Sequence, residues 1–207
     1  MGNINKLSFT IILARHAQTR FNRAGIIQGC SDSPLTRSGL SEIWRMPELI
    51  SEYRPKMIYS SALGRAAFSS SIYSQLLGIP VYFRRHLVEL SCGEWEKSPR
   101  SQVKGPRKIV RSSWVDRPPG GESYQDGEER LRDFVQDLTS GCYDACKMVL
   151  AHASLNRVLV KLVLGLPPQE AISILFPHDT VYVIQNDGMI RWFGLSTGSG
   201  CGFLREV

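Results

Sequence analysis

The sequence has no apolar run that approaches the roughly 18 residues of a membrane-spanning helix. Its first ten residues, MGNINKLSFT, also lack the apolar stretch and small-residue cleavage site of a secretory signal. These absences argue against a helical membrane protein and against export. We therefore expect a cytoplasmic protein that has no membrane partner.

Cysteine is scarce: the chain has five, an odd number, and no Cys-X-X-Cys pair. This pattern argues against a disulfide framework and against a zinc site made of thiolates. Cys142 and Cys146 could share one helix face, but two thiols do not make a metal site. The DxD and HExxH patterns are missing as well, so we expect reduced, structural cysteines and neither a metal nor another cofactor.

Acidic residues are too few to balance the basic ones, and one segment carries the imbalance. The chain has 25 Lys and Arg against 19 Asp and Glu, which gives a net charge of +6. Between residues 97 and 117 the one acid is Asp116, and the basic residues are Lys97, Arg100, Lys104, Arg107, Lys108, Arg111 and Arg117. The net charge of this basic segment, seven basic residues less one acid, therefore equals the net charge of the whole chain. Trp114 is its one aromatic residue and no nucleic-acid motif accompanies it, which argues against a nucleic-acid partner.

Strand-like and helix-like stretches alternate along the 207 residues without a linker, repeat or low-complexity tract. We predict one domain over residues 1–207, of the α/β class: a three-layer αβα sandwich with a mostly parallel sheet and helices on both faces. A helix is expected after the N-cap residue Thr36, and Pro47 is placed to interrupt it. The other expected elements are strands at 8–14, 56–60, 81–83, 147–151, 181–185 and 190–193, and helices at 62–77, 122–138, 155–164 and 168–175.

Polar side chains follow four of the predicted strands at the point where each strand ends. These residues are Arg15 and His16, then Ser60 and Ser61 with Arg65 one turn onward, then Glu89, then His152. The carboxyl ends of parallel strands meet at one edge of a sheet, where ligands usually bind. Arginines and a helix N-terminus, such as the one that follows His152, suit a dianionic phosphate.

Six sequence blocks resemble the histidine phosphatase superfamily, also called the phosphoglycerate mutase-like superfamily, in the right order and over nearly the whole chain. The blocks are RHA at 15–17 with Thr19 and Asn22, QGCSDSPLTRSG at 28–39, SSALGRA at 60–66, LVELSCGEWEK at 87–97, PGGES at 119–123 and AHASLNR at 151–157. One such block is a weak signal, whereas six at the right spacing are specific. The resemblance implies a phosphoglycerate mutase-like fold.

The resemblance also implies roles for the residues at the strand ends. His16 is the expected nucleophile, which carries a phosphohistidine while its other ring nitrogen donates to a backbone carbonyl. Arg15 and Arg65 are expected to clamp the phosphoryl oxygens, and His152 to donate to the same group. Glu89 is the expected general acid and then base.

Two further positions, Asn22 and Gln28, match residues that contact phosphate in the phosphatase branch. They are ordinary loop residues as well, so the sequence supports their role less strongly. Glu94 and Glu96 are nearby alternatives to Glu89 as the acid. The spacing within the block at 87–97 favours Glu89.

The chain departs from the family pattern at four positions beside the two histidines. Ala17 replaces a glycine, Gln18 replaces a glutamate, and Ala153 and Ser154 replace two glycines. Ala153 occupies a substrate-binding position of the pattern. If the family needs glycine there for a positive φ or a close phosphate approach, Ala17 and Ala153 carry a cost.

The resemblance predicts a metal-independent phosphomonoester hydrolase that acts on a small phosphorylated substrate. The span from Glu89 to Pro119 is short for the insertion that closes the site of the mutase branch, which favours hydrolysis. A mutase-type phosphotransferase is the alternative, and a non-catalytic phosphate binder on the same fold is another. The basic segment 97–117 lies where the family builds a lid, so it either selects a polyanionic substrate or is a solvated loop. The oligomeric state stays open, with a homodimer as one possibility.

Overall fold

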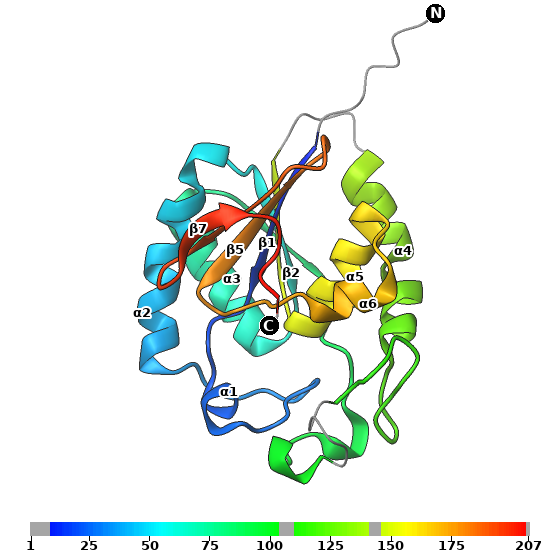
Figure 1. Cartoon of the computed structure of the whole chain (residues 1–207). Helices are drawn as coiled ribbons and strands as arrows, with labels where there is room; N and C mark the ends of the chain where they lie inside the picture. Colours follow the sequence, from blue (N-terminus) through cyan, green and yellow to red (C-terminus); the bar gives the residue numbers. More distant parts are fainter. Residues whose placement is uncertain (1–8, 104–109, 141–145, 206–207) are drawn as a thin grey trace, which may run out of the picture.

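A computed structural model describes residues 9–103, 110–140 and 146–205 of the chain. Seven strands form one sheet in the order β3-β2-β4-β1-β5-β6-β7. Their bounds are β1 Thr10–Arg15, β2 Met57–Ser61, β3 Val81–Arg84, β4 Lys147–Ala151, β5 Thr180–Gln185, β6 Ile190–Gly194 and β7 Gly198–Cys201. Helices cover both faces of the sheet (Figure 1).

The predicted α/β sandwich is confirmed, and its sheet is mixed. Strands β3, β2, β4 and β1 run parallel to one another, whereas β5, β6 and β7 are each antiparallel to the neighbour before them in the sheet. The antiparallel part includes β7, which the sequence did not predict: it holds two glycines and no apolar alternation (GSGC).

The helices lie close to their predicted positions. Their bounds are α1 Arg20–Ala24, α2 Arg37–Arg45, α3 Gly64–Leu77, α4 Tyr124–Ser140, α5 Ala153–Leu164 and α6 Pro168–Ser173. As expected, Thr36 caps α2, accepting the Gly39 N–H, and the α-helix ends before Pro47 and continues as a 3₁₀ helix over Met46–Tyr53. Helix α1 was not among the expected elements, because its five residues are too few to show a periodic pattern.

The strand β1 is buried on both faces, and its alternate side chains belong to two cores. Ile12 packs in the core with Ala66 of α3, on the side of the sheet that α2 and α3 cover. Leu13 packs in the other core with Leu131 of α4 and Val158 of α5. This packing fixes the register of β1, because a one-residue shift would move each of its side chains to the opposite face of the sheet.

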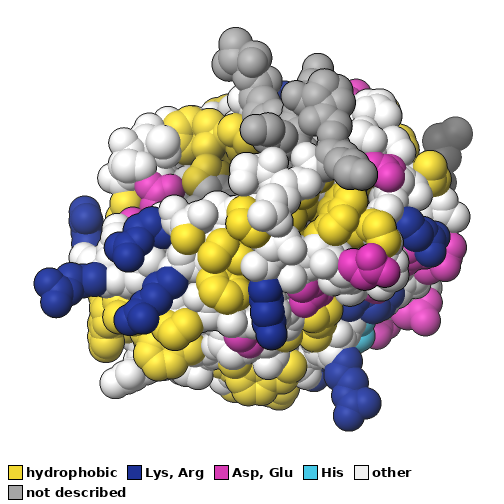
Figure 2. Space-filling model, turned by 90° about the horizontal axis from the view of Figure 1, so that it is seen from below, with side chains coloured by type: hydrophobic (Ala, Val, Ile, Leu, Met, Phe, Trp, Pro, Cys, Tyr) yellow, Lys and Arg dark blue, Asp and Glu magenta, His cyan; other side chains and the backbone are white. Residues whose placement is uncertain are grey.

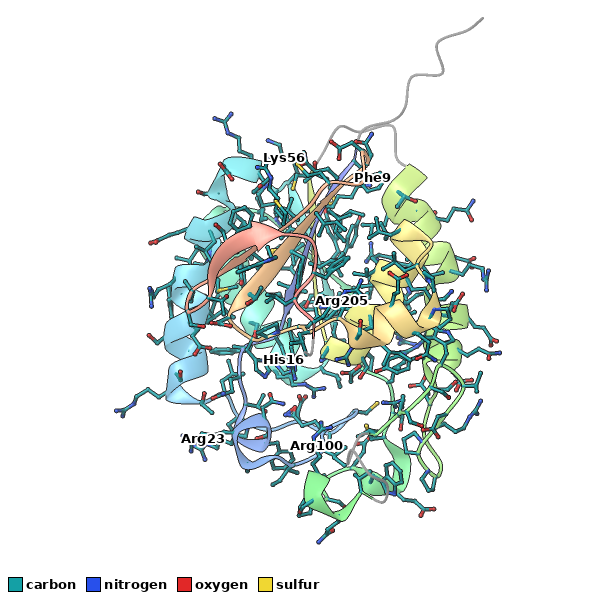
Figure 3. All side chains as sticks on the ribbon, viewed as in Figure 1. Phe9, His16, Arg23, Lys56, Arg100 and Arg205 are labelled. Carbon is teal, nitrogen blue, oxygen red and sulfur yellow. The ribbon has the colours of Figure 1, made fainter. Side chains whose placement is uncertain are left out.

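The carboxyl ends of the four parallel strands meet at one end of the molecule. In Figure 3, Phe9 and Lys56 lie at the upper end of the sheet, His16 lies at its lower end and Arg100 lies below His16. Figure 2 looks onto this lower face, where Lys and Arg side chains project among hydrophobic and uncharged groups. Of the basic segment, Lys104, Arg107 and Lys108 lie outside the described residues, as does Cys142.

Candidate active site

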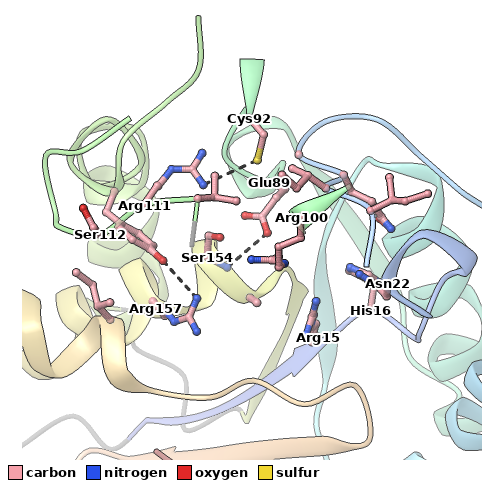
Figure 4. A pocket seen from close by; sticks show the side chains of 18 of the residues that line it. Arg15, His16, Asn22, Glu89, Cys92, Arg100, Arg111, Ser112, Ser154 and Arg157 are labelled. Carbon is pink, nitrogen blue, oxygen red and sulfur yellow. Dashed lines mark hydrogen bonds between the residues drawn. The ribbon is translucent and has the colours of Figure 1, made fainter. Parts of the chain in front are cut away.

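A cavity of about 990 Å³ opens at this lower end of the sheet (Figure 4). Seven of the eight predicted site residues line it: Arg15, His16, Asn22, Gln28, Arg65, Glu89 and Ala153. His152 is not part of this lining, because its side chain is fully buried, but its ring lies against that of His16. The strand ends therefore bring together residues that are far apart in the sequence.

His16 follows β1 and is 3% exposed. Its backbone N–H donates to Ala151 O at 3.0 Å, which ties the residue to the end of β4. The ring Nδ1 lies 2.8 Å from Ala17 O, and Arg65 Nε donates to the ring Nε2 at 3.2 Å. These contacts place the ring proton on Nδ1 and the lone pair on Nε2. Burial lowers the pKa of His16 well below its ordinary value, and His152 and Arg15 lower it further, so the ring is neutral.

Arg65 comes from the first turn of α3 and is 3% exposed. Its Nη1 donates to Ser31 O at 2.7 Å and to Asp32 Oδ1 at 2.8 Å, and its Nη2 donates to Gly29 O at 2.7 Å. The same carboxylate of Asp32 accepts the backbone N–H of Gly64 at 2.6 Å and so caps α3. The loop at 29–32 therefore holds the guanidinium against His16.

Gly29 allows this loop to close on its neighbours. Its backbone has φ +53°, a conformation that residues other than glycine rarely adopt. A Cβ at this position would also lie 2.7 Å from the backbone nitrogen of Cys92. Glu96 fastens the same region, because its carboxylate accepts the N–H groups of Cys30 at 2.9 Å and of Cys92 at 3.1 Å.

Arg15 lies at the end of β1, and its Nη1 donates to Phe176 O at 3.0 Å. Its Nε is buried and has no hydrogen-bond partner within the described parts of the chain. Burial lowers the pKa of Arg15 to about 10, and the nearby Glu89 opposes this effect. The guanidinium therefore stays charged at neutral pH and has a donor to spare for an anion.

His152 is the N-cap of α5, and its ring centroid lies 5.1 Å from that of His16. Ser61 Oγ lies 2.8 Å from Nε2 of His152, and the same oxygen accepts the Leu63 N–H at 3.2 Å. This arrangement favours donation of the Ser61 proton to Nε2, which leaves the histidine proton on Nδ1. Nδ1 is buried and has no partner among the residues described. Burial lowers the pKa of His152 well below its ordinary value, and Arg65 and Arg15 add to that shift.

Glu89 lies at the N-terminus of α5. Its carboxylate accepts the backbone N–H groups of Ser154 at 3.4 Å and Leu155 at 3.3 Å, which the helix dipole favours. It is the one carboxylate among the described residues that line the cavity. Its two alternatives lie elsewhere, because Glu94 is exposed and Glu96 is bonded to the loops as described above.

Asn22 and Gln28 converge on Thr19, the N-cap of α1. Asn22 Oδ1 accepts the Thr19 N–H at 3.1 Å in a capping box, and Gln28 Nε2 donates to Thr19 Oγ1. Both residues therefore hold α1 against the cavity as well as lining it. The group that Asn22 has left for a ligand is its Nδ2, since its oxygen is used in the cap.

The four departures from the family pattern do not strain the backbone. In the described residues, the non-glycine positions with positive φ are Arg54 and Lys97, so neither Ala17 nor Ala153 adopts a conformation that requires glycine. The Ala17 N–H donates to Ser69 Oγ at 3.1 Å. The cost expected for these two alanines is therefore absent from the backbone.

The structure adds residues to the site that were not predicted from the sequence. His178 precedes β5, and its Nδ1 lies 2.7 Å from His16 O, with ring centroids 5.2 Å apart. Burial lowers the pKa of His178 to about 3, so it is neutral and donates to that carbonyl. Arg157 and Tyr124 line the cavity as well. Arg157 closes the block at 151–157, which was the one available signal for it.

Over residues 9–103, 110–140 and 146–205, no group of three or more His, Cys, Asp or Glu side chains is arranged to hold a metal ion. No helix in those ranges is both long and apolar enough to cross a membrane.

Comparison with known proteins agrees with this arrangement. Residues 11–189 match the histidine phosphatase superfamily (branch 1). The chain is 30% identical to the "Putative phosphoserine phosphatase 2" of Hydrogenobacter thermophilus, over 86% of this chain and 90% of that protein. It is 32% identical to a "Probable phosphoglycerate mutase" of Salmonella paratyphi C, over 76% and 75% of the two chains.

The fold matches solved structures of the same kind. A mycobacterial glucosyl-3-phosphoglycerate phosphatase in complex with VO3 superimposes with a TM-score of 0.79, at 23% identity and over 96% of this chain and 99% of that one. The sequence match, the fold and the residues that meet at the strand ends all agree. The chain therefore belongs to the histidine phosphatase superfamily and is a phosphatase of its branch 1.

Proposed function

We propose that the protein is a metal-independent phosphomonoester hydrolase that acts through a phosphohistidine on a small, polyanionic phosphorylated metabolite in the cytoplasm. The observation that carries this proposal is the neutral ring of His16, whose Nε2 lone pair faces Arg65 and whose pKa is lowered by the nearby charge of Arg15 as well. A neutral imidazole with a fixed tautomer is ready to attack phosphorus without first losing a proton.

In the first step, His16 Nε2 attacks the phosphorus atom and the bond from phosphorus to the ester oxygen breaks. Glu89 gives its proton to the leaving oxygen. Arg15, Arg65 and the Nδ1–H of His152 stabilise the charge that develops on the phosphoryl oxygens. The alcohol then leaves the cavity.

In the second step, Glu89 takes a proton from a water molecule, and this water attacks the phosphohistidine. The bond between phosphorus and Nε2 breaks, and the lone pair returns to His16 as inorganic phosphate departs. Glu89 is protonated again and the cycle is complete. The position of Glu89 among the cavity walls supports both of its roles.

The first test is phosphate release from a panel of phosphomonoesters in the presence of EDTA, with the wild type and His16→Ala. We expect turnover by the wild type and its loss in the variant, together with a labelled phosphohistidine that the variant cannot form. Isomerisation of phosphoglycerate faster than phosphate release would assign the protein to the mutase alternative. Binding without turnover or labelling would leave a phosphate-binding protein.

A further inference from the structure

The cavity carries more positive charge than one phosphoryl group requires. Its described lining holds five arginines and one carboxylate, Glu89, the arginines being Arg15, Arg65, Arg100, Arg111 and Arg157. Among these five, Arg65 alone has an acidic partner within the described residues, the Asp32 of the loop at 29–32. Half-buried charges without a partner favour an anion, so the remaining arginines indicate where a ligand's charges lie.

Arg111 lines the cavity and belongs to the basic segment, but its donors are used within the protein and are not free for an anion. It is 5% exposed, its Nε donates to Glu122 O at 2.5 Å and its Nη2 donates to Ser91 O at 2.6 Å. These bonds to backbone carbonyls make it an anchor for the surrounding loops. Arg100 is exposed and also lines the cavity.

Arg157, in contrast, is fixed in the wall and keeps donors free. Its Nε donates to Ile174 O at 2.9 Å and its Nη1 donates to the Tyr124 hydroxyl at 3.3 Å. Tyr124 is itself held firmly, because its ring stacks on Trp114 with centroids 5.1 Å apart at 17°. No partner for Nη2 of Arg157 is found in the described chain, and Figure 4 shows the guanidinium directed into the cavity.

The backbone at residues 174–176 accepts hydrogen bonds from both Arg157 and Arg15, and so sets the spacing between their side chains. Arg157 donates to Ile174 O, and Arg15 donates to Phe176 O two residues later. The intervening carbonyl of Leu175 accepts the Tyr182 hydroxyl at 2.7 Å, so alternate carbonyls have different partners. Two residues of extended chain span about 7 Å. The two arginines are thus placed for two separate anionic groups of one small molecule.

We propose that Arg157 and the Tyr124 hydroxyl form a carboxylate subsite, so that the substrate is a phosphomonoester that carries a carboxylate a few bonds from its phosphate. This inference rests on the proposed function, which places the phosphoryl group at His16 and Arg15. The Tyr124 oxygen already accepts from Arg157, and its own proton is free to donate to a ligand. The donors that remain, chiefly Nη2 and this hydroxyl, suit a monoanionic carboxylate better than a second phosphate.

The test compares substrates that differ in the carboxylate alone. The two pairs are 3-phosphoglycerate with glycerol 3-phosphate, and O-phosphoserine with O-phosphoethanolamine, and 4-nitrophenyl phosphate reports the bare hydrolysis. The measured quantity is the ratio of kcat/KM within each pair. We expect at least one pair to show a preference for the carboxylate of about tenfold or more in the wild type, and Arg157→Gln to reduce that preference by about tenfold to a hundredfold.

Two variants make the result specific. Tyr124→Phe keeps the ring on Trp114 and removes the hydroxyl, so we expect a smaller loss of the same preference. Arg117→Gln removes an arginine whose side chain is 58% exposed and bonded to Asp126, and it should leave every ratio unchanged. A wild type that shows no preference in either pair, or an Arg157→Gln enzyme that loses activity equally on all substrates, would overturn the carboxylate subsite.

The failure of the proposed function has a different signature. If the wild type releases no phosphate even from 4-nitrophenyl phosphate, hydrolysis is refuted whatever Arg157 does. In that case the affinity of the His16→Ala variant for the two compounds of each pair, measured by calorimetry, tests the carboxylate subsite on its own. Tighter binding of the carboxylate-bearing compound that disappears in His16→Ala/Arg157→Gln supports it, and equal binding of both compounds refutes it.

Discussion

Arg65 donates from Nε to the Nε2 of His16 at 3.2 Å, and its two Nη groups are held by the loop at 29–32. The nitrogen that carries the lone pair therefore accepts a hydrogen bond from a cationic side chain. A phosphoryl group that enters must take over this contact. The guanidinium can then turn the same donor from His16 to the phosphoryl oxygens without leaving its place.

Asp32 positions that guanidinium, so we predict that Asp32→Asn lowers kcat/KM by about tenfold while the protein stays folded. Since the Asp32 side chain is 40% exposed, the loss in the free energy of unfolding should stay below about 1 kcal/mol. Steady-state kinetics and urea denaturation measure the two effects. Asp187→Asn, in the turn before β6, serves as the control, and an equal effect of both variants would contradict a role for Asp32.

All four histidines have pKa values below their ordinary value, chiefly because of burial. The unfolded chain therefore binds protons near pH 6.5 that the folded chain does not bind. We predict that stability is greatest above pH 6.5 and falls as the pH decreases below it, by up to about 1.4 kcal/mol per pH unit for each histidine. Urea unfolding between pH 7.5 and 5 measures the slope.

The three histidines of the site should account for most of this slope. His178→Asn removes one titrating group while keeping a donor, so its stability should fall less steeply with acid than that of the wild type. A stability that is constant or rises between pH 6.5 and 5 would show that these rings are protonated in the folded protein.

His178 is linked to His16 by the hydrogen bond from its Nδ1 to the His16 backbone carbonyl. We predict that His178→Ala lowers kcat about tenfold with little change in KM, because the nucleophile loses its fixed orientation while the anion donors remain. Asn can donate from a similar position, so His178→Asn should restore most of the loss. If Asn and Ala are equally impaired, the hydrogen bond to His16 O is not what matters.

Glu89 and Glu96 lie in one sequence block and should differ in effect. We predict that Glu89→Gln lowers kcat about a hundredfold to ten-thousandfold, because general acid and base are lost together. Activated aryl phosphates should suffer less, since their leaving groups need no proton in the first step. Glu96→Gln should chiefly lower stability, by about 1–3 kcal/mol, because it weakens the bonds to Cys30 N and Cys92 N. Thermal unfolding and kinetics of both variants separate these roles, and a reversed order would make Glu96 the acid.

Much of the site could be predicted from the sequence. Arg15 and His16 follow an apolar run, and His152 follows another, so their place at the end of the parallel strands comes from local patterns alone. The block spacings then selected Arg65 and Glu89. These residues line or adjoin the cavity because each follows a parallel strand, and the carboxyl ends of these strands meet at one edge of the sheet.

The tertiary structure decided what the patterns could not. The basic segment left open whether its charges select a substrate or are solvated, and sequence could not show that its Arg111 is buried against backbone carbonyls or that Arg157 of α5 lies in the cavity wall. His178 joins His16 from 162 residues away, and Asp32 reaches Arg65 across a loop. The pattern of apolar and polar residues indicates which face of its own helix or strand a residue occupies. It does not report which distant carbonyl or carboxylate will satisfy a donor, because that partner is fixed by how the loops pack after the sheet has formed.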